Sequence, residues 1–250
     1  MGYANDGMPG GSSWKTVCSQ FIKIGSNDGA DMTLKDLVPG GTWAHGSDQI
    51  KVIADTSAVK FKAVYIWKAQ CSKRTQQQYP ELHDGWYKLT TDVQYDQCVD
   101  DEPLPFGTAV LATASTTTAY LTSSGEVVKG VDDGRIGFSF DGKWRMIGNA
   151  TPVLLHLSDF KPNDAWVHAS DQIKVISETS AVKFKAVYIW KAQCSKRTQQ
   201  QYPDLHDGWY KLTTDVQYGE CVDDEPIPAG SGILAQAASS DAVISIPAAL

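Results

Sequence analysis

The sequence contains few of the residues and patterns on which most catalytic and membrane functions depend. Its 250 residues include only five cysteines, five histidines and four methionines. No apolar run approaches the roughly 20 residues that a membrane-spanning helix needs. The nucleophile-elbow, P-loop, dinucleotide-binding, zinc-protease and CxxC motifs are all missing. The sequence therefore predicts no catalytic residue, no cofactor and no membrane span, so we do not expect an enzyme.

An excess of positive charge is also missing. The formal net charge is −7 at pH 7, and the lysines are spread along the chain rather than gathered in one patch. Nucleic acids and anionic membrane surfaces attract basic proteins, so we expect neither as a partner.

What the sequence does contain is a long internal repeat. Residues 45–105 recur as residues 168–228, 123 positions later and without a gap, and only seven of the 61 positions differ. The same offset aligns shorter matches on both flanks. We therefore predict two homologous domains, residues 1–127 and 128–250, the first with a glycine-rich N-terminal arm at residues 1–13. The differing pairs are Gly46/Ala169, Ala54/Ser177, Asp55/Glu178, Glu81/Asp204, Asp96/Gly219, Gln97/Glu220 and Leu104/Ile227.

The hydrophobic pattern is that of β-strands. Residues 59–68 alternate, and turn-forming residues separate strand-like segments about every 8 to 12 residues. Asp141-Gly142 inside an alternating run indicates a hairpin. Short helical turns are expected at residues 34–38 and 157–161. The sequence thus predicts an all-β protein with two tandem, homologous β-sandwich-like domains.

Four of the cysteines belong to the repeat. Cys71 and Cys98 recur as Cys194 and Cys221, which predicts one disulfide in each domain and an oxidising compartment. The alternative is two buried free thiols in each domain. Cys18 has no repeated counterpart, so it forms either an intermolecular bond or a buried thiol. The first residues lack a basic start and an apolar segment and predict no signal peptide, and the cysteines favour a mature N-terminus over a cytosolic protein.

Histidines and aromatic residues are the remaining candidates for chemistry or binding. For His83 and His206 a polar turn residue is favoured over an acid–base role. No second metal ligand lies near His45 or His83 in the sequence, so no metal site is predicted. Two repeated aromatic pairs favour core side chains, with an interface or a platform that stacks on sugar rings as alternatives. These pairs are Trp86-Tyr87 and Trp209-Tyr210.

Three short motifs carry a resemblance to a known group of proteins. They are the strand segment Gly85-Trp-Tyr87, the turn Pro103-Leu-Pro105-Phe-Gly107 and the ending Ser124-Gly-Glu-Val127. In this combination repeat 1 resembles β-rich repeat modules of secreted and cell-surface bacterial proteins. Residues 168–250 keep the first two motifs and lack the third. The resemblance implies an extracellular setting and no known catalytic residues.

The repeat also suggests how molecules could associate. In register, residues 2–7 correspond to residues 125–130, which link the two repeats. Head-to-tail stacking, with addition of a terminal strand to a neighbour, would therefore reproduce the internal junction, and such a contact makes a filament. The residues expected at this interface are Gly2, Tyr3, Gly7, Val243, Ile244 and Ile246.

The function expected from these observations is structural. We expect an extracellular protein that assembles with copies of itself into a filament or surface layer. One alternative is a secreted bivalent module that binds a glycan or a cell-surface partner. The other is a recent duplication that has no meaning for assembly.

Overall fold

In the computed structural model, 53% of the described residues lie in strands and 4% in helices, and no helix in the described part of the chain reaches seven residues. The all-β prediction is therefore confirmed. No described helix is long and apolar enough to cross a membrane. The structure describes residues 2–11, 13–23, 30–44, 47–58, 60–67, 84–89, 95–128, 134–167, 170–177, 179–190, 200, 206–212 and 218–248.

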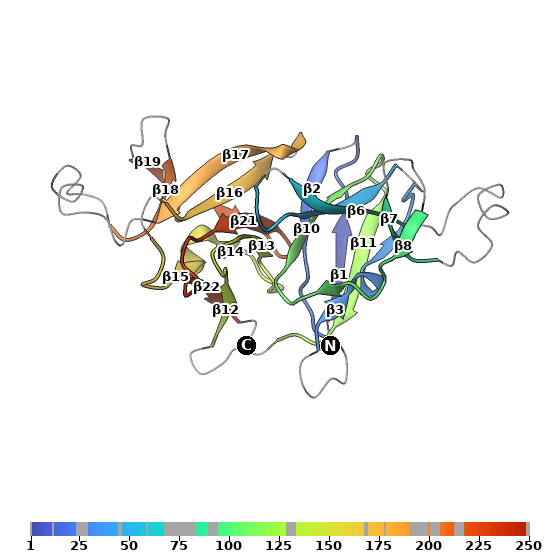
Figure 1. Cartoon of the computed structure of the whole chain (residues 1–250), viewed down its shortest axis with the longest axis horizontal. Helices are drawn as coiled ribbons and strands as arrows, with labels where there is room; N and C mark the ends of the chain where they lie inside the picture. The colour runs from blue at the N-terminus through green and yellow to red at the C-terminus, as the bar shows by residue number, and fades with distance from the viewer. Residues whose placement is uncertain are drawn as a thin grey trace.

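Repeat 1, residues 1–127, forms three antiparallel sheets (Figure 1). Its strands are β1 (Gly2–Gly7), β2 (Trp14–Cys18), β3 (Met32–Thr33), β4 (Val38–Gly40), β5 (Gln49–Ile53), β6 (Phe61–Trp67), β7 (Trp86–Leu89), β8 (Tyr95–Cys98), β9 (Pro103–Leu104), β10 (Ala109–Thr113) and β11 (Tyr120–Gly125). The six-stranded sheet has the order β2-β10-β5-β6-β7-β8, the three-stranded sheet has the order β1-β11-β4, and β3 pairs with β9.

Repeat 2, residues 128–250, has the same topology. Its strands are β12 (Arg135–Ser139), β13 (Trp144–Gly148), β14 (Leu155–His156), β15 (Lys161–Pro162), β16 (Gln172–Ser177), β17 (Ser180–Trp190), β18 (Trp209–Leu212), β19 (Tyr218–Cys221), β20 (Pro226–Ile227), β21 (Gly232–Gln236) and β22 (Val243–Pro247). The sheets are β13-β21-β16-β17-β18-β19, β12-β22-β15 and β14-β20.

The two expected helical turns are present as 3-10 turns, η1 (Leu34–Asp36) and η2 (Leu157–Asp159). Each is closed by the aspartate at its third position. Asp36 accepts a hydrogen bond from the Thr33 N–H at 2.8 Å, and Asp159 accepts one from the His156 N–H at the same distance. A carboxylate that binds a free N–H at the start of a turn stabilises it, so this prediction is confirmed.

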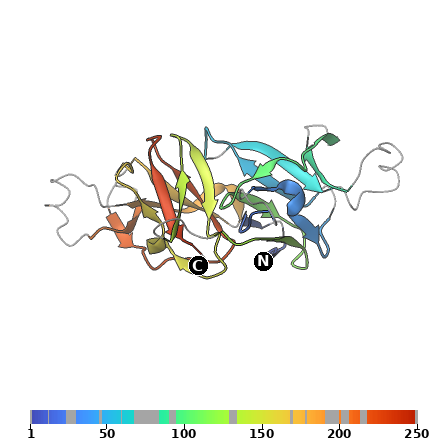
Figure 2. The same ribbon diagram turned by 90° about the horizontal axis from the view of Figure 1, so that it is seen from below.

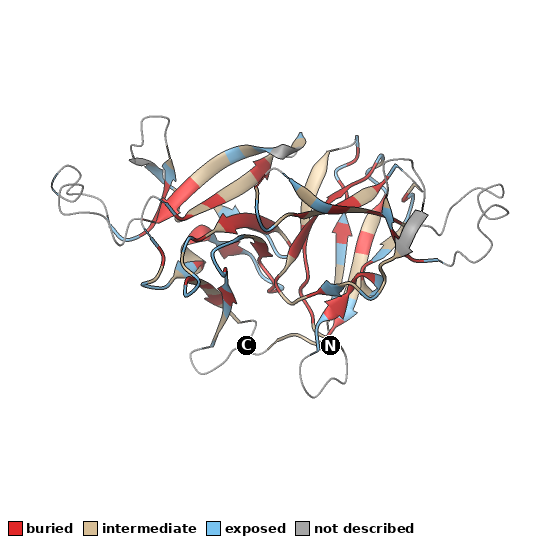
Figure 3. Ribbon diagram, in the orientation of Figure 1, coloured by how far each residue is buried: buried red, intermediate tan, exposed pale blue. Residues whose placement is uncertain are grey.

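The sheets are small and lie in a ring like the four blades of a propeller, not clearly as two tandem sandwiches. The reason lies in β10 and β21, which are buried on both faces (Figure 3). Val110 and Ala112 pack in the core of repeat 1, whereas Ala109 and Leu111 join a core that continues through repeat 2. The prediction of separate sandwiches is therefore not confirmed, and the two-domain division stays a prediction.

The Asp141-Gly142 turn is present, but it does not make a hairpin. Both residues have positive φ, 52° and 71°, and the Lys143 N–H donates to the Phe140 carbonyl at 2.9 Å. The strands on either side nevertheless enter different sheets, since β12 pairs with β22 and β13 pairs with β21. The turn therefore connects two sheets of repeat 2.

Strand pairing corrects the alignment of the two N-terminal regions. The offset of 123 residues matches Cys18 with Asp141. In the structure, Cys18 faces Ala109 in the β2–β10 pair and Gly148 faces Gly232 in the β13–β21 pair. Because Ala109 and Gly232 are 123 residues apart, Cys18 and Gly148 are structurally equivalent although they are 130 positions apart. Repeat 1 thus has seven extra residues after β2.

The first residues of β2 and β13 support the same equivalence. The Lys51 ammonium lies 4.5 Å from the centre of the Trp14 ring, and the Lys174 ammonium lies 4.5 Å from that of Trp144. Partial burial lowers the pKa of both lysines. The two cation–π contacts are therefore copies of one arrangement, which fixes the register of both strands.

The repeats meet at their centre through reciprocal contacts between equivalent residues. The Cys18 N–H donates to the Gly230 carbonyl at 2.7 Å, and the Gly148 N–H donates to the Gly107 carbonyl at 3.0 Å. Each bond joins the last residue of β2 or β13 to the backbone of the other repeat. When equivalent residues make the same contact twice, the interface has the two-fold symmetry of a homodimer. Here both halves belong to one chain.

Small side chains allow this close approach. A Cβ atom placed on Gly232 would lie 2.4 Å from the Cβ of Ala109, and one placed on Gly148 would lie 2.8 Å from the Cβ of Cys18. Ala109 is equivalent to Gly232, and Cys18 is equivalent to Gly148. Each contact therefore joins equivalent positions and lies at the pseudo-two-fold axis that relates the repeats. The interface therefore requires glycine in repeat 2 where repeat 1 has alanine and cysteine.

Both terminal segments are strands of their own repeat. β1 pairs with β11 along its whole length, from Gly2 opposite Gly125 to Gly7 opposite Tyr120. β22 is the central strand of its sheet, between β12 and β15. The N-terminal arm is therefore held by repeat 1 rather than by a neighbour. β1 begins and β22 ends on the same side of the molecule (Figures 1 and 2).

Gly232→Ala should lower the free energy of unfolding by about 1–3 kcal/mol, because the added methyl group overpacks the contact with Ala109. Gly7→Ala is the matched control, since no atom lies within 4 Å of a Cβ at Gly7. Urea unfolding followed by tryptophan fluorescence and circular dichroism measures both. Equal unfolding midpoints for the two variants would contradict the close approach of the repeats.

Candidate functional site

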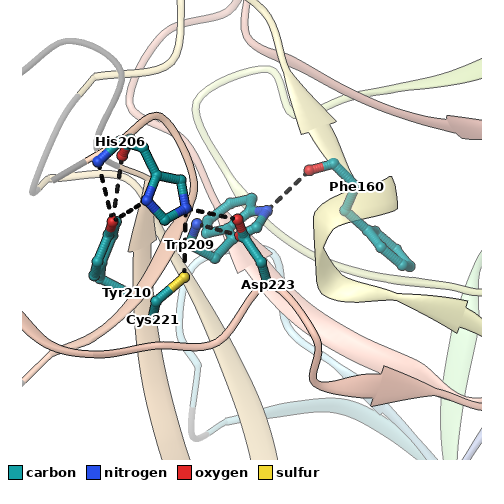
Figure 4. Close-up of polar contacts among 6 residues, drawn as sticks. All are labelled: Phe160, His206, Trp209, Tyr210, Cys221 and Asp223. Atoms are coloured by element: carbon teal, nitrogen blue, oxygen red, sulfur yellow. Dashed lines mark hydrogen bonds and ion pairs between the residues drawn. The ribbon is translucent and has the colours of Figure 1, made fainter.

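A cluster of four polar side chains lies at the outer end of repeat 2 (Figure 4). Tyr210 of β18 pairs with Cys221 of β19, and Asp223 follows two residues later. His206 lies in the segment just before β18. The pairing of the last two strands of the six-stranded sheet thus brings together residues that are 15 positions apart in the sequence.

His206 is at the centre of this cluster. Its Nε2 atom lies 3.4 Å from Oδ2 of Asp223 and 3.7 Å from Sγ of Cys221. The ligand atoms of the three residues all lie within 4.8 Å of one another. The His206 side chain is 60% exposed and that of Asp223 is 23% exposed. Imidazole, thiol and carboxylate groups this close together, open to solvent, are ligands for a transition metal ion.

Tyr210 holds the imidazole from the other side. Its hydroxyl lies 3.1 Å from Nδ1 of His206, and it also contacts the backbone N–H and carbonyl of the same residue at 3.3 Å and 3.4 Å. Burial raises the pKa of Tyr210 more than the hydrogen bond with the His206 backbone lowers it, and the neighbouring Cys221 and Asp223 raise it further. The hydroxyl therefore stays protonated and orients the histidine ring.

Trp209 anchors the cluster to the core. Its indole N–H donates to the Phe160 carbonyl at 2.9 Å, and its backbone N–H donates to Oδ1 of Asp223 at 2.7 Å. The ring is fully buried and packs edge-on against Trp190 and Trp166, with ring centres 5.2 Å and 5.9 Å away. The site is therefore built on a rigid aromatic support.

The burial of these aromatic rings contradicts the alternative in which they form a platform for a glycan. Trp86 and Trp209 are 0% exposed, and Tyr87 and Tyr210 are 3% exposed. A sugar ring stacks only on an aromatic face that solvent can reach, and these four side chains are buried. The four residues are core side chains, which was the interpretation that the sequence favoured.

Repeat 1 carries the same residues at its own outer end. Trp86 donates its backbone N–H to Oδ1 of Asp100 at 2.7 Å, the distance found in repeat 2. Tyr87 pairs with Cys98 as Tyr210 pairs with Cys221. The histidine of this copy, His83, lies outside the described residues.

The described cysteines, Cys18, Cys98 and Cys221, include no pair at disulfide distance. Cys71 and Cys194, the expected partners of Cys98 and Cys221, lie outside the described residues. The two predicted disulfides are thus not found in the described part of the chain, and the pairings stay predictions.

Cys18 is a buried free thiol at the interface between the repeats, 2% exposed. Its Sγ atom contacts the Ser19 carbonyl at 3.5 Å. Burial raises the pKa of this thiol, and the charge of Asp6 raises it further. A protonated and covered thiol is not placed to bond a second molecule.

The expected interface residues belong to the sheets of their own repeats. Gly2, Tyr3 and Gly7 lie in β1, and of these only Tyr3 has a large, exposed side chain, 68% exposed. Val243, Ile244 and Ile246 lie in β22, where both isoleucines are fully buried. Neither terminal strand is free to be added to a neighbour in this fold.

A cleft of about 430 Å³ opens between the repeats. Met8, Trp14 and Lys15 line it from repeat 1, and Ile227 and Lys185 are among its lining residues in repeat 2. Its lining combines apolar side chains with the charged groups of Lys15, Lys185 and Glu225, and no feature of it selects a particular ligand.

Asp6 is a buried carboxylate beside this cleft, 7% exposed. Its Oδ1 atom accepts a hydrogen bond from the Lys15 ammonium at 3.1 Å. Strand pairing makes it equivalent to Phe138 of repeat 2, because Asp6 faces Leu121 and Phe138 faces Ile244. Burial raises the pKa of Asp6 more than the Lys15 charge lowers it.

Comparisons with protein-family models, with curated proteins and with solved structures found no match to this chain. Function is therefore inferred from the chain's own residues and their geometry.

The polar cluster is a site that the sequence did not predict. His206 lies too far from Cys221 along the chain to suggest a shared site. The available signal was the C-x-D spacing of Cys221 and Asp223, repeated as Cys98 and Asp100, together with the pairing of the two outermost strands.

The raised pKa of Asp6 gives stability a defined pH dependence. In the unfolded chain an aspartate ionises near pH ~3.9. Because the pKa of Asp6 is raised in the folded state, the stability that the protonated carboxyl contributes is fully present below that pH. This stability is lost as the pH rises through the pKa of the folded state. The free energy of unfolding of D6N, taken relative to that of wild type, should therefore increase as the pH rises from 3 to 7. Urea unfolding across this range measures the difference. A decrease would show that the Lys15 ion pair outweighs burial.

Proposed function

We propose that the chain is the repeating subunit of an extracellular filament or surface layer, in which each molecule contacts the next at its ends. One observation carries the proposal: β8 and β19 are the outermost strands of the two six-stranded sheets and lie at opposite ends of the molecule (Figure 1). No described strand pairs with their outer edges. An open edge offers backbone N–H and C=O groups to a strand of another molecule.

The inner edges of the same sheets face the other repeat. β2 and β13 meet the other repeat through the bonds from Cys18 to Gly230 and from Gly148 to Gly107. Because the other repeat occupies this side, association through the six-stranded sheets is proposed at the outer ends. Because those ends face away from each other, each subunit has room for two neighbours, which is the requirement for a linear assembly.

The distribution of sequence identity supports contacts at the ends. The nearly identical block, residues 45–105 and 168–228, contains β5 to β9 and β16 to β20 and so includes both outer ends. The divergent flanks form the centre, where the two repeats must fit each other. If the duplicated ends had no function, the block and the flanks would diverge to the same extent. Equivalent contacts with neighbouring molecules would instead keep the two ends similar.

The two ends are similar without being the same. Asp96/Gly219 and Gln97/Glu220 differ, and these positions lie within the edge strands β8 and β19. A contact between β8 of one molecule and β19 of the next joins unlike surfaces. Such a heterologous contact continues indefinitely unless it closes into a ring, and so it makes a filament.

The extracellular setting is supported by the duplicated cysteines and by the resemblance to secreted β-rich modules. This support comes from the sequence and not from the fold.

A second candidate function is a bivalent binding module. The repeated polar cluster, with Tyr210, Cys221 and Asp223 matched by Tyr87, Cys98 and Asp100, favours it by placing the same side chains at both ends. This candidate requires a monomer with two equivalent sites for a cell-surface partner, and a glycan would have to bind elsewhere than on the buried aromatic rings.

Gly219→Lys should block assembly, because a lysine in an edge strand is a common means of preventing edge-to-edge pairing. Gly7→Lys is the matched control, in the edge strand β1 near the centre and with no atom within 4 Å of its Cβ. We expect wild type and Gly7→Lys to form polymers as concentration rises, and Gly219→Lys to remain monomeric. Light scattering and negative-stain electron microscopy measure this.

The opposite pattern, with only Gly7→Lys blocked, would show that β1 makes the contact. A wild-type protein that stays monomeric at high concentration would contradict the proposal and favour the bivalent binding module.

A further inference from the structure

The polar cluster at the outer end of repeat 2 has the dimensions of a zinc site. With Zn–N and Zn–O bonds of about 2.1 Å and a Zn–S bond of about 2.3 Å at tetrahedral angles, the nitrogen lies about 3.6 Å from the sulfur and about 3.4 Å from the oxygen. His206 Nε2 lies 3.7 Å from Sγ of Cys221 and 3.4 Å from Oδ2 of Asp223. The distances from Nε2 to the other two atoms therefore match those of a tetrahedral zinc site, and the ligand atoms of all three residues lie within 4.8 Å of one another.

The surrounding hydrogen bonds direct these atoms inward. The Tyr210 hydroxyl donates a hydrogen bond to the His206 carbonyl and can accept one from the Nδ1–H group. With its proton on Nδ1, the imidazole has its free lone pair on Nε2. Oδ1 of Asp223 accepts the Trp209 N–H, which leaves Oδ2 facing His206. Metal-binding histidines are commonly held in this way through their second ring nitrogen.

A simple ion pair does not account for this arrangement. At 3.4 Å, Nε2 and Oδ2 are farther apart than the about 2.7–2.9 Å of a charge-assisted hydrogen bond. An imidazole–carboxylate pair also gives no role to Cys221, whose thiol faces the same nitrogen. One ion between the three atoms explains both distances.

We propose that Nε2 of His206, Sγ of Cys221 and Oδ2 of Asp223 bind one Zn²⁺ ion, with a water molecule in the fourth position. The thiolate and imidazole ligands favour zinc over calcium or magnesium, which prefer oxygen ligands. Cys221 binds as a thiolate, and its proton passes to solvent. The inference does not depend on the proposed assembly.

The repeat predicts a second site of the same kind. His83, Tyr87, Cys98 and Asp100 occur at the same spacing, and the bond from Trp86 to Asp100 matches that from Trp209 to Asp223. We therefore expect two zinc ions per chain, although His83 lies outside the described residues.

Zinc binding competes with the predicted disulfides. A cysteine bonded to another cysteine has no thiolate to offer, so Cys221 cannot both bind zinc and pair with Cys194. If zinc binds, the duplicated cysteines no longer indicate an oxidising compartment, whereas the end-to-end assembly is unaffected.

Titration with Co²⁺, a spectroscopic probe for zinc, tests the site in the full chain under a non-chelating reductant. We expect two equivalents bound, with a thiolate-to-cobalt charge-transfer band and the visible bands of tetrahedral cobalt. His206→Gln and Cys221→Ser should each lower this to one equivalent. The matched control His156→Gln changes an exposed histidine outside the cluster and should keep two. Tyr210→Phe should weaken binding about 10- to 100-fold at this site, as loss of an orienting partner does.

Three results would overturn the proposal. They are the absence of the charge-transfer band, unchanged stoichiometry in His206→Gln, and a disulfide at Cys221 in peptide maps of protein purified without reductant. Circular dichroism confirms that each variant is folded. One equivalent in wild type that His206→Gln abolishes would keep the site in repeat 2 and exclude the copy in repeat 1.

Discussion

The close contact between the two repeats at β2 and β13 is the constraint on which the rest of the structure depends. It includes two equivalent hydrogen bonds, from the Cys18 amide to Gly230 and from the Gly148 amide to Gly107, and it brings Gly232 within van der Waals distance of Ala109. Backbone groups at a sheet edge must be paired or solvated, and here each repeat pairs the edge of the other. Burial of β10 and β21 on both faces follows, and with it the joining of two cores into one.

The same contact decides where the molecule can interact with others. It covers the inner edges of the six-stranded sheets and turns their outer edges, β8 and β19, toward opposite ends. The terminal strands are used within their own sheets and are not free for exchange. The proposed assembly therefore uses the two ends, where the sequence is most nearly duplicated and where the cluster around His206 lies.

Much of this fold could be predicted from the sequence, because its signals are local. Alternation predicts strands, the short helical turns are expected at residues 34–38 and 157–161, and the buried role of Trp209 follows from an aromatic residue on a strand. Three features could not be predicted, because they depend on pairing in three dimensions. The seven-residue insertion shifts the register at Cys18, the shared core appears only when the repeats pack, and His206 meets Cys221 only through the pairing of β18 with β19.

Hydrogen exchange of the Cys18 and Gly148 amides, resolved by NMR, tests the central contact most directly. Both N–H groups point away from their own sheets and toward carbonyls of the other repeat. If the repeats are locked together as described, both amides exchange as slowly as those of the core strand β10, because all of them open only in global unfolding. Fast exchange at both amides, with β10 still protected, would show that the repeats fold separately and do not hold each other in this arrangement.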